Sequence, residues 1–257
     1  RSSDLSWFTS VFQSHPAPRA LSQCMPGLVS WIKEDLARRL ETGRTVSILI
    51  APAADATHVI TAIQELLAGD PQVRDRIRLI VSDLDHLGRK EAHLKSEAVR
   101  TGMEFAFIRG AVYSSFVRTM AAQRAPFDMV ISIGLSTPMP RPYILEHYRW
   151  VRAHLVEDGV LITGCFPPSG RSLTTCKAGE DPSVHAGLLD TCGFDPTTIR
   201  IHTVGRKSGT VIGIRKKELR RRRGVRELPP FFSMLPEMRS GHRSDAVVCT
   251  SHQEIAS

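Results

Sequence analysis

The stretch Thr45–Ala51 (TVSILIA) begins the part of the chain that decides the fold. Its apolar residues show no helical period, which is typical of a strand buried on both faces of a parallel sheet. Four similar apolar runs follow it: Arg76–Ser82, Met103–Ile108, Phe127–Ile133 and Gly159–Thr163. Stretches with helical character separate the runs: Thr57–Leu67, Leu87–Thr101, Ser114–Gln123 and Tyr143–Leu155. Five alternating units with right-handed crossovers predict an α/β fold with a doubly wound, parallel sheet.

The end of this region departs from the alternation. After a predicted helix at Ser183–Cys192, the apolar runs Ile199–Val204 and Thr210–Lys216 flank a short loop that contains glycine. Two strands joined by so short a loop form a hairpin, and a hairpin is antiparallel. We therefore predict a mostly parallel, seven-stranded sheet over residues 45–217 that closes with one antiparallel strand.

Two flanking segments complete the predicted organisation. Residues 1–44 form a lead-in, with a Pro-rich turn at His15–Pro18 and a helix over residues 26–42 whose first turn contains Pro26. Residues 218–257 form a basic extension that we expect to be flexible.

The net charge of +8 is distributed unevenly along the chain. Residues 215–257 carry ten Lys or Arg against five acidic residues, which leaves the rest of the chain only mildly basic, at +3. The run Arg215–Arg226 offers charges for phosphates but contains no aromatic side chains on which bases could stack. Nucleic acid is therefore a less favoured partner than a small molecule.

Composition narrows the remaining classes of protein. The chain is 42% hydrophobic, which is enough for a full core, and no apolar run reaches the length that spans a bilayer. The five cysteines include no C-x-x-C pair, and the ten histidines show no ligand spacing. We expect a cytoplasmic protein with reduced cysteines and without a bound metal.

Several stretches of the predicted sheet resemble one enzyme family. Leu79–Asp85 (LIVSDLD) resembles a second strand with its terminal acid, and Phe127–Gly134 (FDMVISIG) resembles a fourth-strand motif. His154–Gly164 resembles the following loop and fifth strand, and Leu188–Phe194 resembles the helix end before the hairpin. In this order, they resemble the Rossmann-like, class I S-adenosylmethionine-dependent methyltransferases. The resemblance implies S-adenosylmethionine as cofactor and methyl transfer to a small-molecule acceptor.

The first motif departs from the family pattern. The family has an acid followed by a Gly-rich loop, whereas this chain places Ile50 at the acid and Pro52, Ala54 and Ala56 at the glycine positions. Small residues still permit a close approach, but proline removes a backbone donor.

The resemblance also implies a set of cofactor-binding positions at the carboxyl ends of the strands. Asp83, which follows the second strand, is expected to accept the ribose hydroxyls, although a helix cap is the alternative. Asp85 is expected to cap the next helix. For Asp55, contact with the cofactor's ammonium group and an ordinary helix cap both stay open. The full predicted set is Ala51, Pro52, Ala53, Asp55, Asp83, Leu84, Gly110, Ala111, Val112, Ser132, Ile133 and Gly134.

Two residues are candidates for catalysis. Tyr143 and His147 are four positions apart on one predicted helix, so either side chain could orient or deprotonate an acceptor. The alternative is that this helix face simply packs on the sheet.

Three further hypotheses use the same fold. Loss of the glycines and of the acid favours a catalytically inactive scaffold or regulatory protein. An altered position of the methionine moiety would favour transfer of its aminocarboxypropyl group instead of methyl. The basic C-terminal run would favour methylation of RNA.

Overall fold

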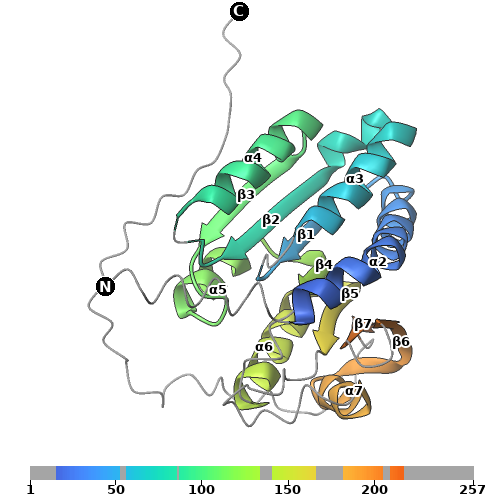
Figure 1. Ribbon diagram of the computed structural model, residues 1–257, viewed down its shortest axis with the longest axis vertical. Coiled ribbons are helices and arrows are strands. Elements are labelled where there is room, and N and C mark those ends of the chain that lie inside the picture. The colour runs from blue at the N-terminus through green and yellow to red at the C-terminus, as the bar shows by residue number, and fades with distance from the viewer. Residues whose placement is uncertain are drawn as a thin grey trace, which may run out of the picture.

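The computed structural model describes residues 16–52, 56–85, 87–133, 141–165, 182–204 and 209–216. They form one seven-stranded sheet in the order β3-β2-β1-β4-β5-β7-β6 (Figure 1). The strands are β1 (Val46–Ile50), β2 (Ile77–Asp83), β3 (Glu104–Arg109), β4 (Phe127–Ser132), β5 (Leu155–Cys165), β6 (Phe194–Val204) and β7 (Gly209–Lys216). Strands β1 to β5 pair in parallel, and β7 runs antiparallel to both β5 and β6. The predicted mostly parallel sheet with one reversed strand is confirmed.

Helices cover both faces of the sheet. They are α2 (Pro16–Leu40), α3 (Thr57–Gly69), the 3₁₀ helix η1 (Pro71–Arg76), α4 (Arg89–Thr101), α5 (Ser115–Ala122), α6 (Arg141–His154) and α7 (Pro182–Thr191). In Figure 1, α2, α3 and α4 lie on one side of the sheet, and α5, α6 and α7 lie on the other. The first two connections between parallel strands, through α3 and α4, therefore cross one face of the sheet, and the next two, through α5 and α6, cross the other, as in a doubly wound fold.

Two apolar cores result from this layering. Within β1, Ile48 and Ile50 pack with the helices α2, α3 and α4, whereas Leu49 packs in the opposite core with α5, α6 and α7. Successive side chains of a strand point to opposite faces, so a continuous apolar run fills both cores. Burial of each such side chain stabilises the fold by roughly 1.5–3 kcal/mol.

Helix α2 begins ten residues earlier than the sequence predicts. Its first residue is Pro16, so the expected turn at residues 15–18 is wrong in its described part, and Pro26 lies inside the helix. Pro16 and Pro18 occupy the first turn, where no backbone N–H is needed and the fixed φ of proline suits a helix.

Buried ion pairs attach α2 to the amino end of the sheet. Arg39, which is almost fully buried, donates to Asp35 at 2.7 Å and lies 3.4 Å from Asp128. Asp128 also accepts the backbone N–H of Ser47 at 2.9 Å. Burial alone would raise the pKa of Asp35, but the guanidinium groups of Arg39, Arg38 and Arg215 outweigh it and hold that pKa below its ordinary value.

Candidate functional site

Asp83 ends β2 at the carboxyl edge of the sheet, and only 9% of the residue is exposed. Its Oδ1 accepts the backbone N–H of Asp85 at 3.2 Å, and its Oδ2 lies 2.9 Å from Nζ of Lys90. The carboxylate is therefore held by one donor on each oxygen. Asp85 has a different task, since its Oδ2 accepts the N–H of Glu91 at 2.7 Å in the first turn of α4. The expected capping role of Asp85 is observed.

The chain after β3 passes directly beside Asp83. The N–H of Gly110 donates to the carbonyl of Asp83 at 2.9 Å, which places Gly110 and the half-buried Ala111 next to the end of β2. Gly110 has a φ of +152°, and a Cβ there would lie 2.7 Å from Cγ2 of Val117. A side chain at residue 110 would thus be both strained and crowded. Val112 is buried, with its contacts in the core below.

Most of the exposed large apolar side chains follow this edge of the sheet in the chain. Among the described residues, seven large apolar side chains are exposed, and five of them follow the carboxyl end of β2, β3 or β4 in the chain. These five are Leu84, Leu87, Tyr113, Phe116 and Tyr143. Exposed apolar side chains that follow these strand ends in the chain favour a binding site at this edge.

The carboxyl ends of β1 and β4 are joined by hydrogen bonds. The N–H of Ala51 donates to the carbonyl of Ile131 at 2.9 Å, and Oγ of Ser132 donates to the carbonyl of Ala51 at 2.7 Å. Because the single hydroxyl proton of Ser132 is used there, Nε2 of His147, 2.9 Å away, must be the donor to Oγ. Pro52 follows with no N–H of its own, joined to Ala51 by a cis peptide bond.

The two predicted catalytic side chains of α6 do not converge on one site. Tyr143 is 43% exposed near the start of the helix, whereas His147 is 1% exposed and hydrogen-bonded beneath the ends of β1 and β4. Burial, with a smaller contribution from the nearby charge of Arg118, lowers the pKa of His147 to about 3. The imidazole is therefore neutral at pH 7 and has no exposed face for an acceptor.

A second chain of hydrogen bonds, which the sequence did not reveal, continues from Ser132. Thr163 donates to the carbonyl of Ser132 at 3.2 Å, and the hydroxyl of Tyr148 lies 3.0 Å from Oγ1 of Thr163. Since the proton of Thr163 is already used, Tyr148 donates to Thr163 and accepts from Nε2 of His185. The only hint in the sequence was a threonine at the end of an apolar strand.

His185 completes this chain from α7. Burial lowers its pKa to about 4, so it too is neutral at pH 7. The proton on Nε2 leaves Nδ1 as an acceptor, and no residue in the described part of the chain donates to it.

Several of the predicted cofactor-binding residues are not found at an accessible position of the site. Ser132 is fully buried, and Ile133 is buried in the core on the α2 side of the sheet. Ala53, Asp55 and Gly134 lie outside the described residues.

Only the first two basic residues of the run Arg215–Arg226 lie among those the structure describes, and both are engaged. Arg215 pairs with Asp35 at 2.8 Å, and Lys216 donates to the carbonyl of Leu155 at 2.9 Å. The described ranges also contain no group of three metal-ligating side chains and no helix able to cross a membrane.

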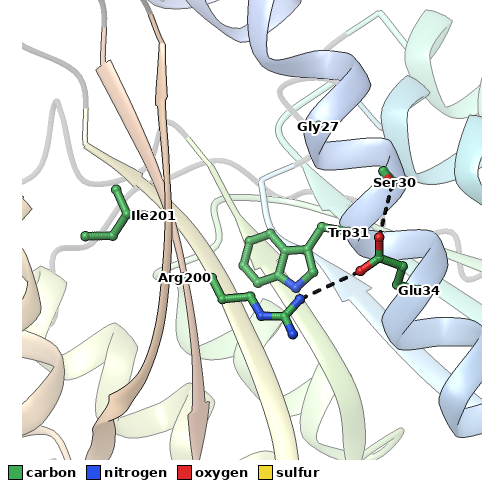
Figure 2. Close-up of a pocket in the computed structure, with 6 residues that line it drawn as sticks. All are labelled: Gly27, Ser30, Trp31, Glu34, Arg200 and Ile201. Atoms are coloured by element: carbon green, nitrogen blue, oxygen red, sulfur yellow. Dashed lines mark hydrogen bonds and ion pairs between the residues drawn. The ribbon is translucent and has the colours of Figure 1, made fainter.

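A separate hollow of about 460 Å³ lies between α2 and β6. Figure 2 shows Trp31, Ser30 and Glu34 of α2 facing Arg200 of β6, with Glu34 and Arg200 3.8 Å apart. This hollow contains none of the predicted site residues.

Comparison with known proteins gives structural matches only. No family model and no curated protein matches the sequence. The structure is similar to 1,6-didemethyltoxoflavin-N1-methyltransferase from Burkholderia thailandensis, with 18% identity, a TM-score of 0.55 and coverage of 82% of this chain and 86% of that one. It is also similar to magnesium protoporphyrin IX methyltransferase from Synechocystis PCC 6803, with 13% identity, a TM-score of 0.53 and coverage of 79% and 86%.

The share of a matched protein that this chain covers varies. An O-methyltransferase family protein from Burkholderia thailandensis matches with 12% identity and a TM-score of 0.51 over 77% of this chain, but the chain spans only 57% of that protein's length. Identities this low establish a shared fold and no more. With its strand order and reversed β7, the chain has the fold of the class I S-adenosylmethionine-dependent methyltransferases.

Proposed function

We propose that the protein binds S-adenosylmethionine and transfers its methyl group to a small-molecule acceptor. The observation that carries this proposal is Asp83, a carboxylate held at the carboxyl end of β2 beside the glycine that follows β3. Two neighbours of the same fold support it, because their structures contain S-adenosylhomocysteine and their names specify small-molecule substrates.

The residues around Asp83 suit the nucleoside part of this cofactor. Oδ1 of Asp83 keeps a lone pair beside its bond from the Asp85 N–H, and Oδ2 is bonded only by the flexible side chain of Lys90, so the carboxylate can accept ribose hydroxyls. Leu84, 46% exposed, and the Gly110–Ala111 backbone offer apolar and close-packed surface for a purine ring. When bound, the cofactor supplies a methyl group already activated by a sulfonium, so the protein's main contribution is to position the reactants.

Ser132 and His147 are proposed to act as positioning residues. Ser132 donates to the carbonyl of Ala51 and His147 holds the Ser132 hydroxyl, and this fixes the backbone exit of β1, where the family that the sequence resembles has its glycine-rich loop. Tyr143, exposed at the start of α6, is the described side chain that we propose contacts the acceptor.

An inactive scaffold is the second candidate function. It is favoured by the end of β1, where Pro52 has no N–H to offer the methionine part of a cofactor and the Ala51 carbonyl is already bonded to Ser132. Aminocarboxypropyl transfer remains a variant of the first candidate, and the mass of the product distinguishes it from methyl transfer.

Calorimetric titration with S-adenosylhomocysteine tests the first proposal. We expect saturable binding to the unaltered protein and a loss of at least about tenfold in affinity for Asp83→Asn, because a charged acceptor for the ribose is removed. The matched control is Asp75→Asn, since Asp75 is an exposed acid of η1. No binding of S-adenosylmethionine or S-adenosylhomocysteine at millimolar concentration would sink the proposal.

The cellular setting and the domain limits are also proposals. We propose a reducing, cytoplasmic location, which is supported by the unpaired, buried Cys192. We further propose that residues 45–217 form the catalytic domain, with residues 1–44 as its lead-in and residues 218–257 as an extension. A small molecule remains the favoured partner over nucleic acid, since Arg215 and Lys216 already have partners on the body of the protein.

A further inference from the structure

Lys90 holds the one carboxylate that the proposed function assigns to the ribose. Its Nζ lies 2.9 Å from Oδ2 of Asp83, from the first turn of α4. Arg109, the last residue of β3 and the register partner of Asp83, pairs with Glu91 at 2.6 Å. Among the described residues, Lys90 is the cation that pairs with Asp83, at 2.9 Å, and the second bond to that carboxylate comes from the backbone of Asp85.

The exposures of the two side chains show which partner faces the solvent. The Asp83 side chain is 12% exposed and that of Lys90 is 37% exposed. The N–H of Asp85 belongs to the backbone and keeps its place, whereas Lys90 has a long and flexible side chain. Lys90 is therefore both the more exposed and the more easily displaced of the two groups bonded to Asp83.

We propose that Lys90 competes with the ribose of the nucleoside for Asp83 and lowers the affinity of the site for its cofactor. This inference rests on the proposed function. A ribose diol makes its best contact with a carboxylate through both oxygens, and Oδ2 is the oxygen that Lys90 covers. When the ribose binds, the ammonium group moves into water, where it is well solvated.

The size of the effect follows from the kind of ion pair. A partly exposed pair between a lysine and a carboxylate is weak and is screened by salt. Removal of the lysine charge should therefore strengthen nucleoside binding by roughly two- to fivefold. An opposite sign is expected if Lys90 instead orients Asp83 for the ribose, because its removal would then weaken binding.

Titration of Lys90→Met with S-adenosylhomocysteine and with adenosine tests the proposal. We expect both ligands to bind roughly two- to fivefold more tightly than to the unaltered protein. The matched control is Lys33→Met, because Lys33 forms a similar exposed pair with Glu65 at 2.7 Å between α2 and α3. Lys33→Met should leave both affinities unchanged.

Salt gives a second, independent measurement. Adenosine carries no charge, so salt acts on its binding mainly through the protein's own ion pairs. Between about 20 mM and about 500 mM NaCl, we expect its affinity for the unaltered protein to rise and its affinity for Lys90→Met to stay flat. Lys90→Arg keeps the charge and should keep the response to salt.

The outcomes separate the two proposals. If the unaltered protein binds the ligands and Lys90→Met binds them equally or more weakly, the competition is overturned and the cofactor assignment stands. If Lys90→Met tightens binding equally in an Asp83→Asn background, the effect does not act through Asp83 and the competition is again overturned. If no form binds either ligand, the proposed function fails and the inference fails with it.

Discussion

Trp31 of α2 lies directly against Gly213 of β7: a Cβ built on Gly213 would come within 1.3 Å of Cη2 of the indole. Trp31 is buried, and its ring occupies the space that any other residue at position 213 would fill. Ile212 and Ile214 pack in the opposite core, so Gly213 is the residue of this part of β7 that faces α2. The close packing of α2 on the sheet thus depends on a glycine, which has no side chain, at position 213.

Gly213→Ala is therefore expected to lower the free energy of unfolding by about 1–3 kcal/mol, the usual cost of forcing extra atoms into a packed core. Urea unfolding followed by circular dichroism measures the change. Gly187→Ala is the control, since Gly187 lies in α7 and a Cβ there would have no atom within 4 Å. That substitution should be neutral or should stabilise the fold by up to about 1 kcal/mol. Equal effects of the two substitutions would contradict the packing argument.

Arg39→Met is expected to destabilise the fold far more than Arg38→Met. Without Arg39, the buried carboxylates of Asp35 and Asp128 each lose a buried cationic partner. Such a loss typically lowers the free energy of unfolding by about 3–5 kcal/mol. Arg38 also contacts Asp35, at 2.6 Å, but its side chain is 48% exposed, so its loss should cost less than about 1 kcal/mol. Comparable losses of unfolding free energy for the two variants would show that burial does not set the strength of this network.

The number of parallel strands and the reversed strand at the end could be predicted from the sequence because each strand is a separate apolar run. The ends of the elements were harder to predict. Strand β5 starts at Leu155 rather than at Gly159, directly after α6 ends, and β6 starts at Phe194 rather than at Ile199, with a register shift between Asp195 and Arg200. Pairing with neighbouring strands decides those ends, and a local pattern does not contain that information.

In the candidate site, too, a residue that follows a local pattern could be predicted, whereas contacts between distant parts of the chain could not. Asp83 could be located because it is the acid that directly follows an apolar strand. The contact of Lys90 with Asp83 depends on the path of the chain between β2 and α4, and the chain from Thr163 through Tyr148 to His185 depends on how α6 and α7 pack on the sheet. These contacts join residues 7 to 37 positions apart with no repeated spacing, so no motif announces them.

Two of the buried histidines, His147 and His185, predict a loss of stability in mild acid. In the folded protein the pKa of His147 is about 3 and that of His185 is about 4, both below the ordinary value of 6.5. Below pH 6.5 the unfolded chain therefore binds more protons than the folded one, and the free energy of unfolding falls. Each imidazole contributes up to about 1.4 kcal/mol per pH unit.

Urea unfolding between about pH 7.5 and pH 5 checks this prediction, because that window lies above the ordinary pKa of carboxyl groups. His185→Gln removes one of these two imidazoles and should reduce the slope by the contribution of that one group. Unfolding free energies that stay constant over this window, or a slope that His185→Gln leaves unchanged, would contradict the assignment of neutral, buried imidazoles.

Ser132→Ala is expected to weaken the binding of S-adenosylhomocysteine by about three- to tenfold, because the buried carbonyl of Ala51 loses its donor and the end of β1 loses its support. Tyr148→Phe provides the comparison, since it removes from the same buried region a hydroxyl that bonds to Thr163 and His185. Both variants should lose about 1–2 kcal/mol of unfolding free energy. Only Ser132→Ala should lose affinity beyond about twofold. An equal loss of affinity in the two variants would mean that general loosening of the fold, rather than the position of Ala51, controls the cofactor site.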